Sequence, residues 1–134
     1  MCVIHDQIDR LSLYTSLIPY ASHIAQAFSE GDKAEALCEV KEIWGVTRPE
    51  AELKRETPEE AVELILLRSG EEAVYVSGED AAKASRVHLL PGQFLAIYPG
   101  ESYLMQGMTG DEPGPVEKWL CRLPCPPAFC HPQD

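Results

Sequence analysis

The sequence predicts a mainly β domain of the sandwich or barrel type with one short helix near its start. From about residue 38 onward, short segments of strand-like composition follow one another, and turn residues separate them. Two such turns, Pro91-Gly92 and Pro99-Gly100, enclose the apolar segment 93–98. Many short strands divided by Gly and Pro are typical of a sandwich or a barrel.

Size and charge limit the classes of function. The chain has 134 residues, with 11 basic and 22 acidic side chains and a formal net charge of −11, and this length fits one domain. An acidic chain repels the phosphate backbone, so we expect no nucleic-acid partner. Membrane association is not expected either, because no apolar run approaches the roughly 20 residues that a spanning helix needs.

The N-terminus and the cysteines predict a cytoplasmic protein. The first residues lack the basic region, apolar region and cleavage site of a secretory signal peptide. The five cysteines are an odd number without tight paired spacing, which argues against a disulfide framework. Reduced thiols in the cytoplasm are therefore expected.

The expected helix belongs to an N-terminal segment, residues 1–31. Pro19 suits the first turn of a helix, and Gly31 suits its end. Between them an apolar stripe recurs at helical spacing. The stripe consists of Leu17, Ala21, Ile24, Ala25 and Phe28.

Strands are expected at 38–46, 72–77, 86–90, 93–98 and 116–123. In the last of these, Trp119, Cys121 and Leu123 share one face, while Lys118 and Arg122 share the other. This alternation predicts a strand that covers a core on one side only. The tail 124–134 contains four prolines and is expected to be irregular.

Residues 57–68 are compatible with a helix or a strand. Thr57-Pro58-Glu59-Glu60 has an N-cap hydroxyl, a proline at the first helical position and a capping-box glutamate, and Gly70 could end such a helix. The apolar run after Glu60 is equally compatible with a buried strand. Local pattern alone favours the helix.

The ligand types of a zinc site occur in Cys121, Cys125, Cys130 and His131. Their spacing is not that of a zinc finger or ribbon, and we interpret these residues as bystanders. The four histidines show no His-x-His or Glu-x-His spacing of the kind a metal-dependent cupin would need. An acidic cluster in residues 50–60 is interpreted as solvated surface, with paired-carboxylate acid–base chemistry as the alternative.

Three stretches resemble a known family. These are Ile8–Tyr14 before Pro19, the turn Arg68–Glu72, and residues 91–101 followed by 110–118. They resemble the YhcH/YjgK/YiaL family of cupin-like proteins, which includes the β-galactosidase small-subunit type and a sialic-acid anomerase. The resemblance implies a double-stranded β-helix (a cupin-like jelly roll) over residues 36–123 that pairs as a homodimer. It also places a strand at Val62–Arg68, against the local pattern, and makes 57–60 a loop or turn.

The resemblance assigns five residues to the site. The family's metal ligands begin with a Glu-x-His pair and an Arg, which Glu52 and Arg55 match, but Lys54 stands in the place of the His. Glu63 matches an acidic ligand on the next strand, and Tyr103 falls near the position of a second His. A lysine ammonium has no free lone pair, so the resemblance implies a degenerate site without zinc or another cofactor. Lys54 could occupy the vacated volume as a fixed charge paired with Glu52 or Glu63.

Two classes of function remain open. In the first, the site has lost its chemistry, and the protein binds a small sugar or acidic metabolite or acts as a non-catalytic partner of a sugar-processing enzyme. In the second, it is an active, metal-independent sugar anomerase. Anomerisation needs only proton transfer at the ring oxygen and the anomeric hydroxyl. The catalytic candidates would then be Glu52, Lys54, Glu63 and Tyr103, and Arg55 would bind the substrate.

Overall fold

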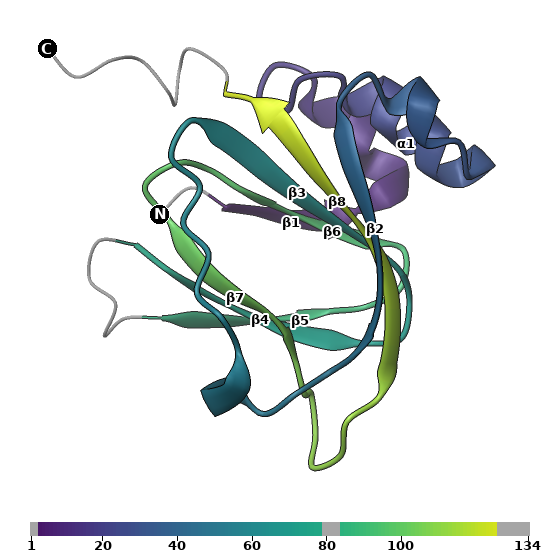
Figure 1. Cartoon of the computed structure of the whole chain (residues 1–134). Helices are drawn as coiled ribbons and strands as arrows, with labels where there is room; N and C mark the ends of the chain where they lie inside the picture. Colours follow the sequence, from purple (N-terminus) through teal and green to yellow (C-terminus); the bar gives the residue numbers. More distant parts are fainter. Residues whose placement is uncertain (1–2, 79–83, 126–134) are drawn as a thin grey trace, which may run out of the picture.

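Two antiparallel sheets face each other in the computed structural model of the chain, which describes residues 3–78 and 84–125 (Figure 1). The larger sheet has five strands in the order β1-β6-β3-β8-β2. These are β1 (Val3–Gln7), β6 (Gln93–Ile97), β3 (Ala61–Ser69), β8 (Pro115–Pro124) and β2 (Glu39–Val46). The smaller sheet has the order β5-β4-β7, with β5 (Ser85–Leu89), β4 (Glu72–Ser77) and β7 (Ser102–Gly107). The expected two-sheet β architecture is therefore confirmed.

Helical segments lie against the outer face of the five-stranded sheet (Figure 1). They are the short η1 (Ile8–Tyr14), α1 (Ala21–Glu30) and η2 (Lys33–Ala36), while η3 (Glu50–Glu52) lies at the other end of the roll. Helix α1 ends at Gly31 as expected, where φ is 74°. Its start differs from the prediction, because Tyr20 takes a φ of 60° and leaves Pro19 outside the first turn. No helix among the described residues has the length and apolar character to cross a membrane.

Two separate cores follow from the period of two along the strands. The outer core lies between the helices and the large sheet and includes Phe28, Leu64 and Trp119. The inner core lies between the two sheets and includes Ile65 and Tyr103.

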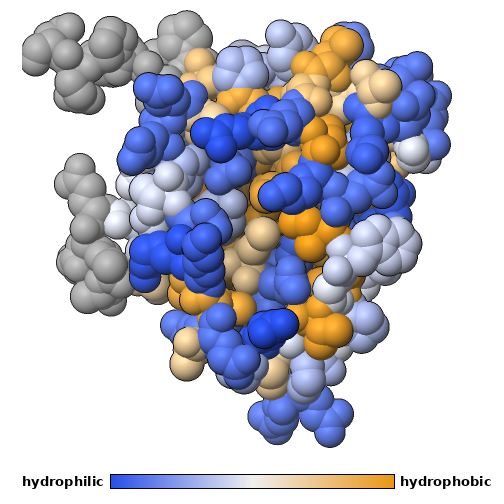
Figure 2. Space-filling view, viewed as in Figure 1, coloured by the Kyte–Doolittle hydropathy of each residue, from blue (hydrophilic) through white to orange (hydrophobic). Residues whose placement is uncertain are grey.

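Viewed from the same side as Figure 1, the surface shows apolar side chains in the middle of the face, among hydrophilic ones (Figure 2).

Strand β8 has buried residues on both faces. Trp119, Cys121 and Leu123 pack into the outer core, as predicted. The opposite face was expected to be solvated, but Lys118 on that face is fully buried, although Arg122 is exposed. The one-sided prediction is wrong at Lys118 because the second sheet covers this part of β8.

The segment that was compatible with a helix or a strand is β3. It pairs with β6 on one side and β8 on the other, so each edge of the segment is hydrogen-bonded within the sheet. The helix favoured by the local pattern is wrong, and the strand implied by the family resemblance at Val62–Arg68 is confirmed. Tertiary pairing outweighs local propensity here. Residues 57–60 form a loop.

Strands β1 and β7 were not among the expected elements. β1 pairs with β6 from Val3↔Ile97 to Gln7↔Gln93, so the large sheet includes residues that precede the helices. β7 pairs with β4 and carries an irregularity between Ala73 and Tyr75. The β roll therefore includes residues 3–7, which the expected range 36–123 left out.

Candidate functional site

Glu52 and Lys54 do not lie on a strand that lines the roll. Glu52 ends η3, its side chain is exposed, and its carboxylate lies 4.0 Å from the guanidinium of Arg48. Lys54 follows in the extended segment after η3, and it is also exposed. The half-buried Leu53 between them approaches Gly107 of β7 instead. The expected inward strand with an ammonium at Lys54 is wrong, because η3 interrupts the extended chain and an apolar residue takes the inward position.

Arg55 connects its loop to the small sheet. Its Nη1 donates a hydrogen bond to Oγ of Ser77, at 3.0 Å, and Ser77 is buried at the end of β4. The next residue, Glu56, forms an isolated antiparallel bridge with Tyr103 through two backbone hydrogen bonds of 2.8 Å. The loop that carries the predicted site residues is thus fixed along β7, with its charged side chains outward.

Glu63 and Tyr103 are brought together, as expected. Glu63 lies on β3 on the same face as Ile65 of the inner core, and Tyr103 lies on β7 of the opposite sheet. The Tyr103 hydroxyl donates a hydrogen bond of 3.0 Å to Oε1 of Glu63. Burial and the nearby Glu63 carboxylate raise the pKa of Tyr103 well above its ordinary value. Tyr103 therefore stays protonated and acts as a donor that orients Glu63.

An open pocket of about 420 Å³ lies beside Glu63. It is lined by Lys33, Glu39, Val40, Lys41, Glu42, Glu63, Leu120 and Arg122. Arg122 of β8 stands in register between Glu39 of β2 and Glu63 of β3. Of the remaining charges, Lys33 and Glu42 form an ion pair of 3.2 Å. The pocket thus offers a guanidinium beside an oriented carboxylate, which can hold a carboxylate and hydroxyl groups of one ligand.

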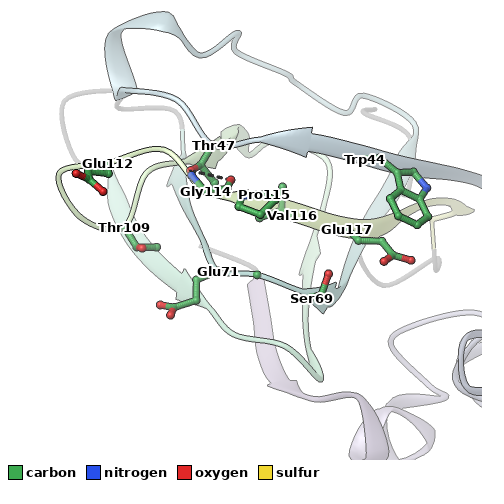
Figure 3. A pocket seen from close by; sticks show the side chains of 11 residues that line it. Trp44, Thr47, Ser69, Glu71, Thr109, Glu112, Gly114, Pro115, Val116 and Glu117 are labelled. Carbon is green, nitrogen blue, oxygen red and sulfur yellow. Dashed lines mark hydrogen bonds between the residues drawn. The ribbon is translucent and has the colours of Figure 1, made fainter.

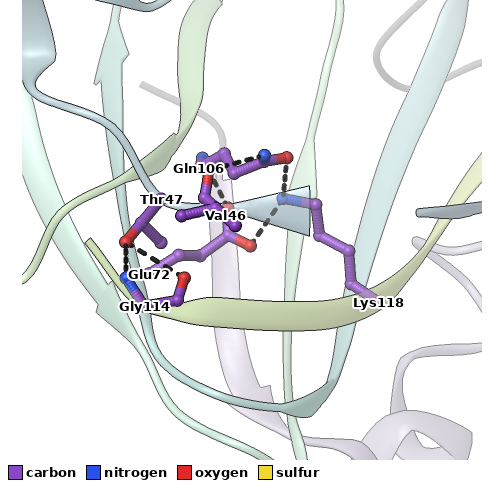
Figure 4. A network of polar contacts seen from close by, with 6 residues as sticks. All are labelled: Val46, Thr47, Glu72, Gln106, Gly114 and Lys118. Atoms are coloured by element: carbon purple, nitrogen blue, oxygen red, sulfur yellow. Dashed lines mark hydrogen bonds and ion pairs between the residues drawn. The ribbon is translucent and has the colours of Figure 1, made fainter. Parts of the chain in front are cut away.

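The roll also holds a buried ammonium group, which comes from Lys118 and not from Lys54. Lys118 Nζ lies 2.6 Å from Oε1 of Glu72 and 3.2 Å from Oε1 of Gln106 (Figure 4). The second Glu72 oxygen accepts a hydrogen bond of 2.7 Å from the backbone N–H of Gln106. Burial lowers the pKa of Lys118, against the opposing effect of Glu72.

Sequence reasoning missed this pair. Glu72 and Lys118 lie 46 positions apart on two different sheets, and each occurs in a strand where a charged residue would ordinarily face solvent. The sequence gives no clear signal for the pair, because Glu72 is the first residue of β4 and Lys118 stands beside Glu117 in a strand that also carries Arg122. The side chain of Gln106, the third member of the network, lies against Gly45. A Cβ added at Gly45 would lie only 2.5 Å from Nε2 of Gln106.

Cys38, Cys121 and Cys125 lie on the outer side of the large sheet. Cys38 and Cys121 are free thiols, and a hydrogen bond between them lowers the pKa of Cys38 and raises that of Cys121. Cys125 is disulfide-bonded, which contradicts the expectation of reduced thiols at this position. Cys130 and His131, the other candidates for a zinc site, lie outside the described residues.

The donor set does not fit a metal ion. Within residues 3–78 and 84–125, no three His, Cys, Asp or Glu side chains are grouped closely enough to coordinate one. In the pocket beside β3, Glu63 accepts a hydrogen bond from a tyrosine hydroxyl and lies beside an arginine, and neither is a ligand that divalent ions prefer.

Comparison with known proteins identifies the fold. No protein-family model matches the sequence, and no curated protein does. The structure is similar to hydroxypropylphosphonic acid epoxidase from S. wedmorenis in complex with fosfomycin, with a TM-score of 0.54 and 12% identity over 68% of this chain and 46% of that one. It is also similar to FeII HppE, with a TM-score of 0.53 and 12% identity over 63% of this chain and 42% of that one.

These neighbours are cupin-fold proteins, so the expected cupin-like jelly roll is confirmed. At 12% identity the likeness concerns the fold alone. The chain spans less than half the length of these two solved proteins.

Proposed function

We propose that this cupin-fold protein binds a small sugar acid or a similar acidic metabolite, without a metal ion, in the pocket beside Glu63. The observation that carries the proposal is the position of Glu63, which accepts a hydrogen bond from Tyr103 and also lines a pocket of about 420 Å³ with Arg122. A volume of this order suits a small molecule. Arg122 would bind the acid group of the ligand, and Glu63 would accept hydrogen bonds from its hydroxyls.

Two further considerations support this ligand class. The family resemblance at residues 68–72, 91–101 and 110–118 implies carbohydrate chemistry and a homodimer, and the homodimer rests on that resemblance alone. A structural neighbour was solved in complex with fosfomycin, and its name refers to a phosphonic acid. Small acidic ligands are thus known on this fold, although fold-level analogy does not identify a ligand.

Metal-independent anomerisation is a second candidate, and the exposure of Glu63 to the pocket favours it. A carboxylate there could take a proton from the anomeric hydroxyl and return one at the ring oxygen. Tyr103 would act as a positioning residue, because its hydroxyl is buried and its raised pKa keeps it protonated. Glu52 and Lys54 would need to act from the exposed loop at η3, away from the residues that line the pocket.

The binding proposal can be tested by NMR titration with three probes: N-acetylneuraminic acid, glucuronic acid and glucose. We expect the two acids to bind and Arg122→Gln to weaken that binding by about tenfold, since a charge-assisted pair is worth roughly 1.5–3 kcal/mol. Glu63→Gln should weaken binding by a smaller factor. Glu30→Gln, on the exposed end of α1, serves as the matched control.

Equal binding of glucose and the acids, or an unchanged affinity in Arg122→Gln, would contradict the proposal. Lys54→Gln distinguishes the pocket from the exposed loop. If this variant alone weakens the binding of the acids, the ligand binds at the loop and not in the pocket. Anomer exchange, measured in the same samples, tests the second candidate. An exchange rate equal to the buffer rate for all three probes excludes it for these sugars.

A further inference from the structure

A second pocket, of about 470 Å³, lies at the other end of β2 and β8 (Figure 3). Its walls come from Trp44 of β2, the turn after β3 that carries Glu71, and the loop before β8 that carries Glu112. Pro115 and Val116 provide apolar surface between them. None of these residues lines the pocket beside Glu63, so this is a separate site.

Trp44 presents its indole to solvent at the rim. Its side chain is 71% exposed, whereas the other tryptophan of the chain, Trp119, is only 2% exposed. Trp44 stands in register with Glu117 on the neighbouring strand, and the two side chains lie at the same end of the pocket (Figure 3). An exposed aromatic face beside a carboxylate offers both parts of a cation site.

The charge lining this pocket has one sign. Three carboxylates, of Glu71, Glu112 and Glu117, line it, and no basic side chain does so among the residues the structure describes. Two of them are fixed by partners outside the lining, since Glu117 lies 3.5 Å from Arg68 and Glu71 lies 2.6 Å from Nε2 of His88. An acidic ligand would be repelled here, in contrast to the pocket that contains Arg122.

The loop that carries Glu112 is held in place by hydrogen bonds to Thr47, the residue after β2. Thr47 Oγ1 accepts a hydrogen bond of 2.8 Å from the N–H of Gly114 and donates one of 3.3 Å to its carbonyl. The backbone N–H of Thr47 donates to the same carbonyl at 2.9 Å. The pocket is therefore formed before a ligand arrives, which lowers the entropic cost of binding.

We propose that this pocket binds a small organic cation, one that carries an alkylammonium or guanidinium group. The cation would lie against the face of Trp44, with its charge balanced by Glu117, which lies at the same end of the pocket (Figure 3). Such a contact combines cation–π attraction with ion pairing. A neutral sugar could also stack on Trp44, but it would gain little from the negative charge of the lining.

The chain's two tryptophans make the test direct. Two-dimensional ¹H–¹⁵N NMR resolves two indole N–H signals, and Trp44→Phe assigns them. We expect tetramethylammonium and arginine amide, each added at constant ionic strength against sodium chloride, to shift the Trp44 signal saturably and leave that of Trp119 in place. Glucose serves as the neutral probe and should produce no saturable shift.

Variants locate the effect. Glu117→Gln should weaken binding of both cations about two- to fivefold, and Trp44→Ala, followed through backbone signals, should do so by a similar factor. Trp44 is exposed and Glu117 is half-buried, and circular dichroism checks that both variants fold. Glu30→Gln on α1 is the matched control for lost negative charge.

The proposal fails if neither cation gives a saturable shift, if glucose shifts the signal as strongly, or if Glu30→Gln weakens binding as much as Glu117→Gln. Each outcome is independent of sugar-acid binding beside Glu63, because the two pockets share no lining residue.

Discussion

Lys118 and Glu72 form an ion pair in which both side chains are fully buried and Nζ lies 2.6 Å from Oε1. The pair joins β8 of the large sheet to β4 of the small one, and Gln106 of β7 completes its hydrogen bonds. A pair of this kind is favourable only while all its members are present, because each charge has lost its hydration. It therefore holds the two sheets in one arrangement at this end of the roll.

Removing one member should be strongly destabilising. We expect Lys118→Met to lower the free energy of unfolding by about 3–5 kcal/mol, because it leaves the Glu72 carboxylate buried without a counter-charge. The double variant Lys118→Met/Glu72→Gln should recover much of this loss, since a neutral amide oxygen can still accept from Gln106 N–H. Urea unfolding of the three proteins measures both effects. A double variant no more stable than the single one would contradict this account.

The hydrogen bond between Tyr103 and Glu63 should make the free energy of unfolding fall as the pH becomes alkaline. The pKa of Tyr103 is raised in the folded protein, so the native state keeps the proton at a pH where the unfolded chain has released it. Its contribution is complete below the ordinary tyrosine pKa of about 10 and is lost as pH rises above that value.

Tyr103→Phe should therefore show a smaller loss of stability between pH 9 and 11 than the wild type in urea unfolding. At pH 8 the variant should be less stable by about 1 kcal/mol, because the buried Tyr103 hydroxyl loses its hydrogen bond to the half-buried Glu63. Part of the alkaline dependence should remain, since hydrogen bonding to Asp6 also raises the pKa of Tyr14. Identical pH slopes in the two proteins would show that Tyr103 is not the group responsible.

Much of the fold could be predicted from the sequence, because local signals and tertiary structure agree at most strands. Pro91-Gly92 marks the turn before β6, and alternation places Trp119 in the outer core. At β3 they disagree, since a good helix start precedes a segment that two neighbouring strands hold in the sheet. β7 was missed because Ser102–Gly107 shows neither clear alternation nor β-branched residues.

The candidate site was predictable only in part. Glu63 and Tyr103 do meet across the roll, as the family resemblance implied. Lys54 was expected to point into the roll, but its side chain is exposed. The sequence pattern does not reveal the short helix η3, which precedes Lys54 and leaves Leu53 in the inward position. Arg122 and Lys118 share one face of β8, and both were expected to be solvated. The second sheet buries Lys118 and leaves Arg122 exposed.

Gly70 and Gly100 offer a matched comparison of backbone strain and steric contact. Both have positive φ, 83° at Gly70 and 97° at Gly100. An added Cβ at Gly70 would lie 2.1 Å from the carbonyl oxygen of Pro115, whereas at Gly100 it would meet nothing within 4 Å. We expect Gly100→Ala to cost about 1–2 kcal/mol from conformation alone, and Gly70→Ala to cost clearly more. Thermal unfolding of both variants measures the difference, and equal losses would mean that the turn at Gly70 relaxes freely.

Removal of metal ions should leave ligand binding beside Glu63 unchanged. Glu63 accepts a hydrogen bond from Tyr103 and lies beside Arg122, and the guanidinium of Arg122 would repel a divalent cation. We expect protein treated with EDTA and then dialysed to bind N-acetylneuraminic acid with unaltered affinity, and stoichiometric zinc to weaken that binding or leave it as it was. Elemental analysis of the untreated protein is the control, because it shows whether there was metal to remove. A loss of affinity after EDTA that zinc or iron(II) restores would show that a metal takes part, and the metal-free site would have to be abandoned.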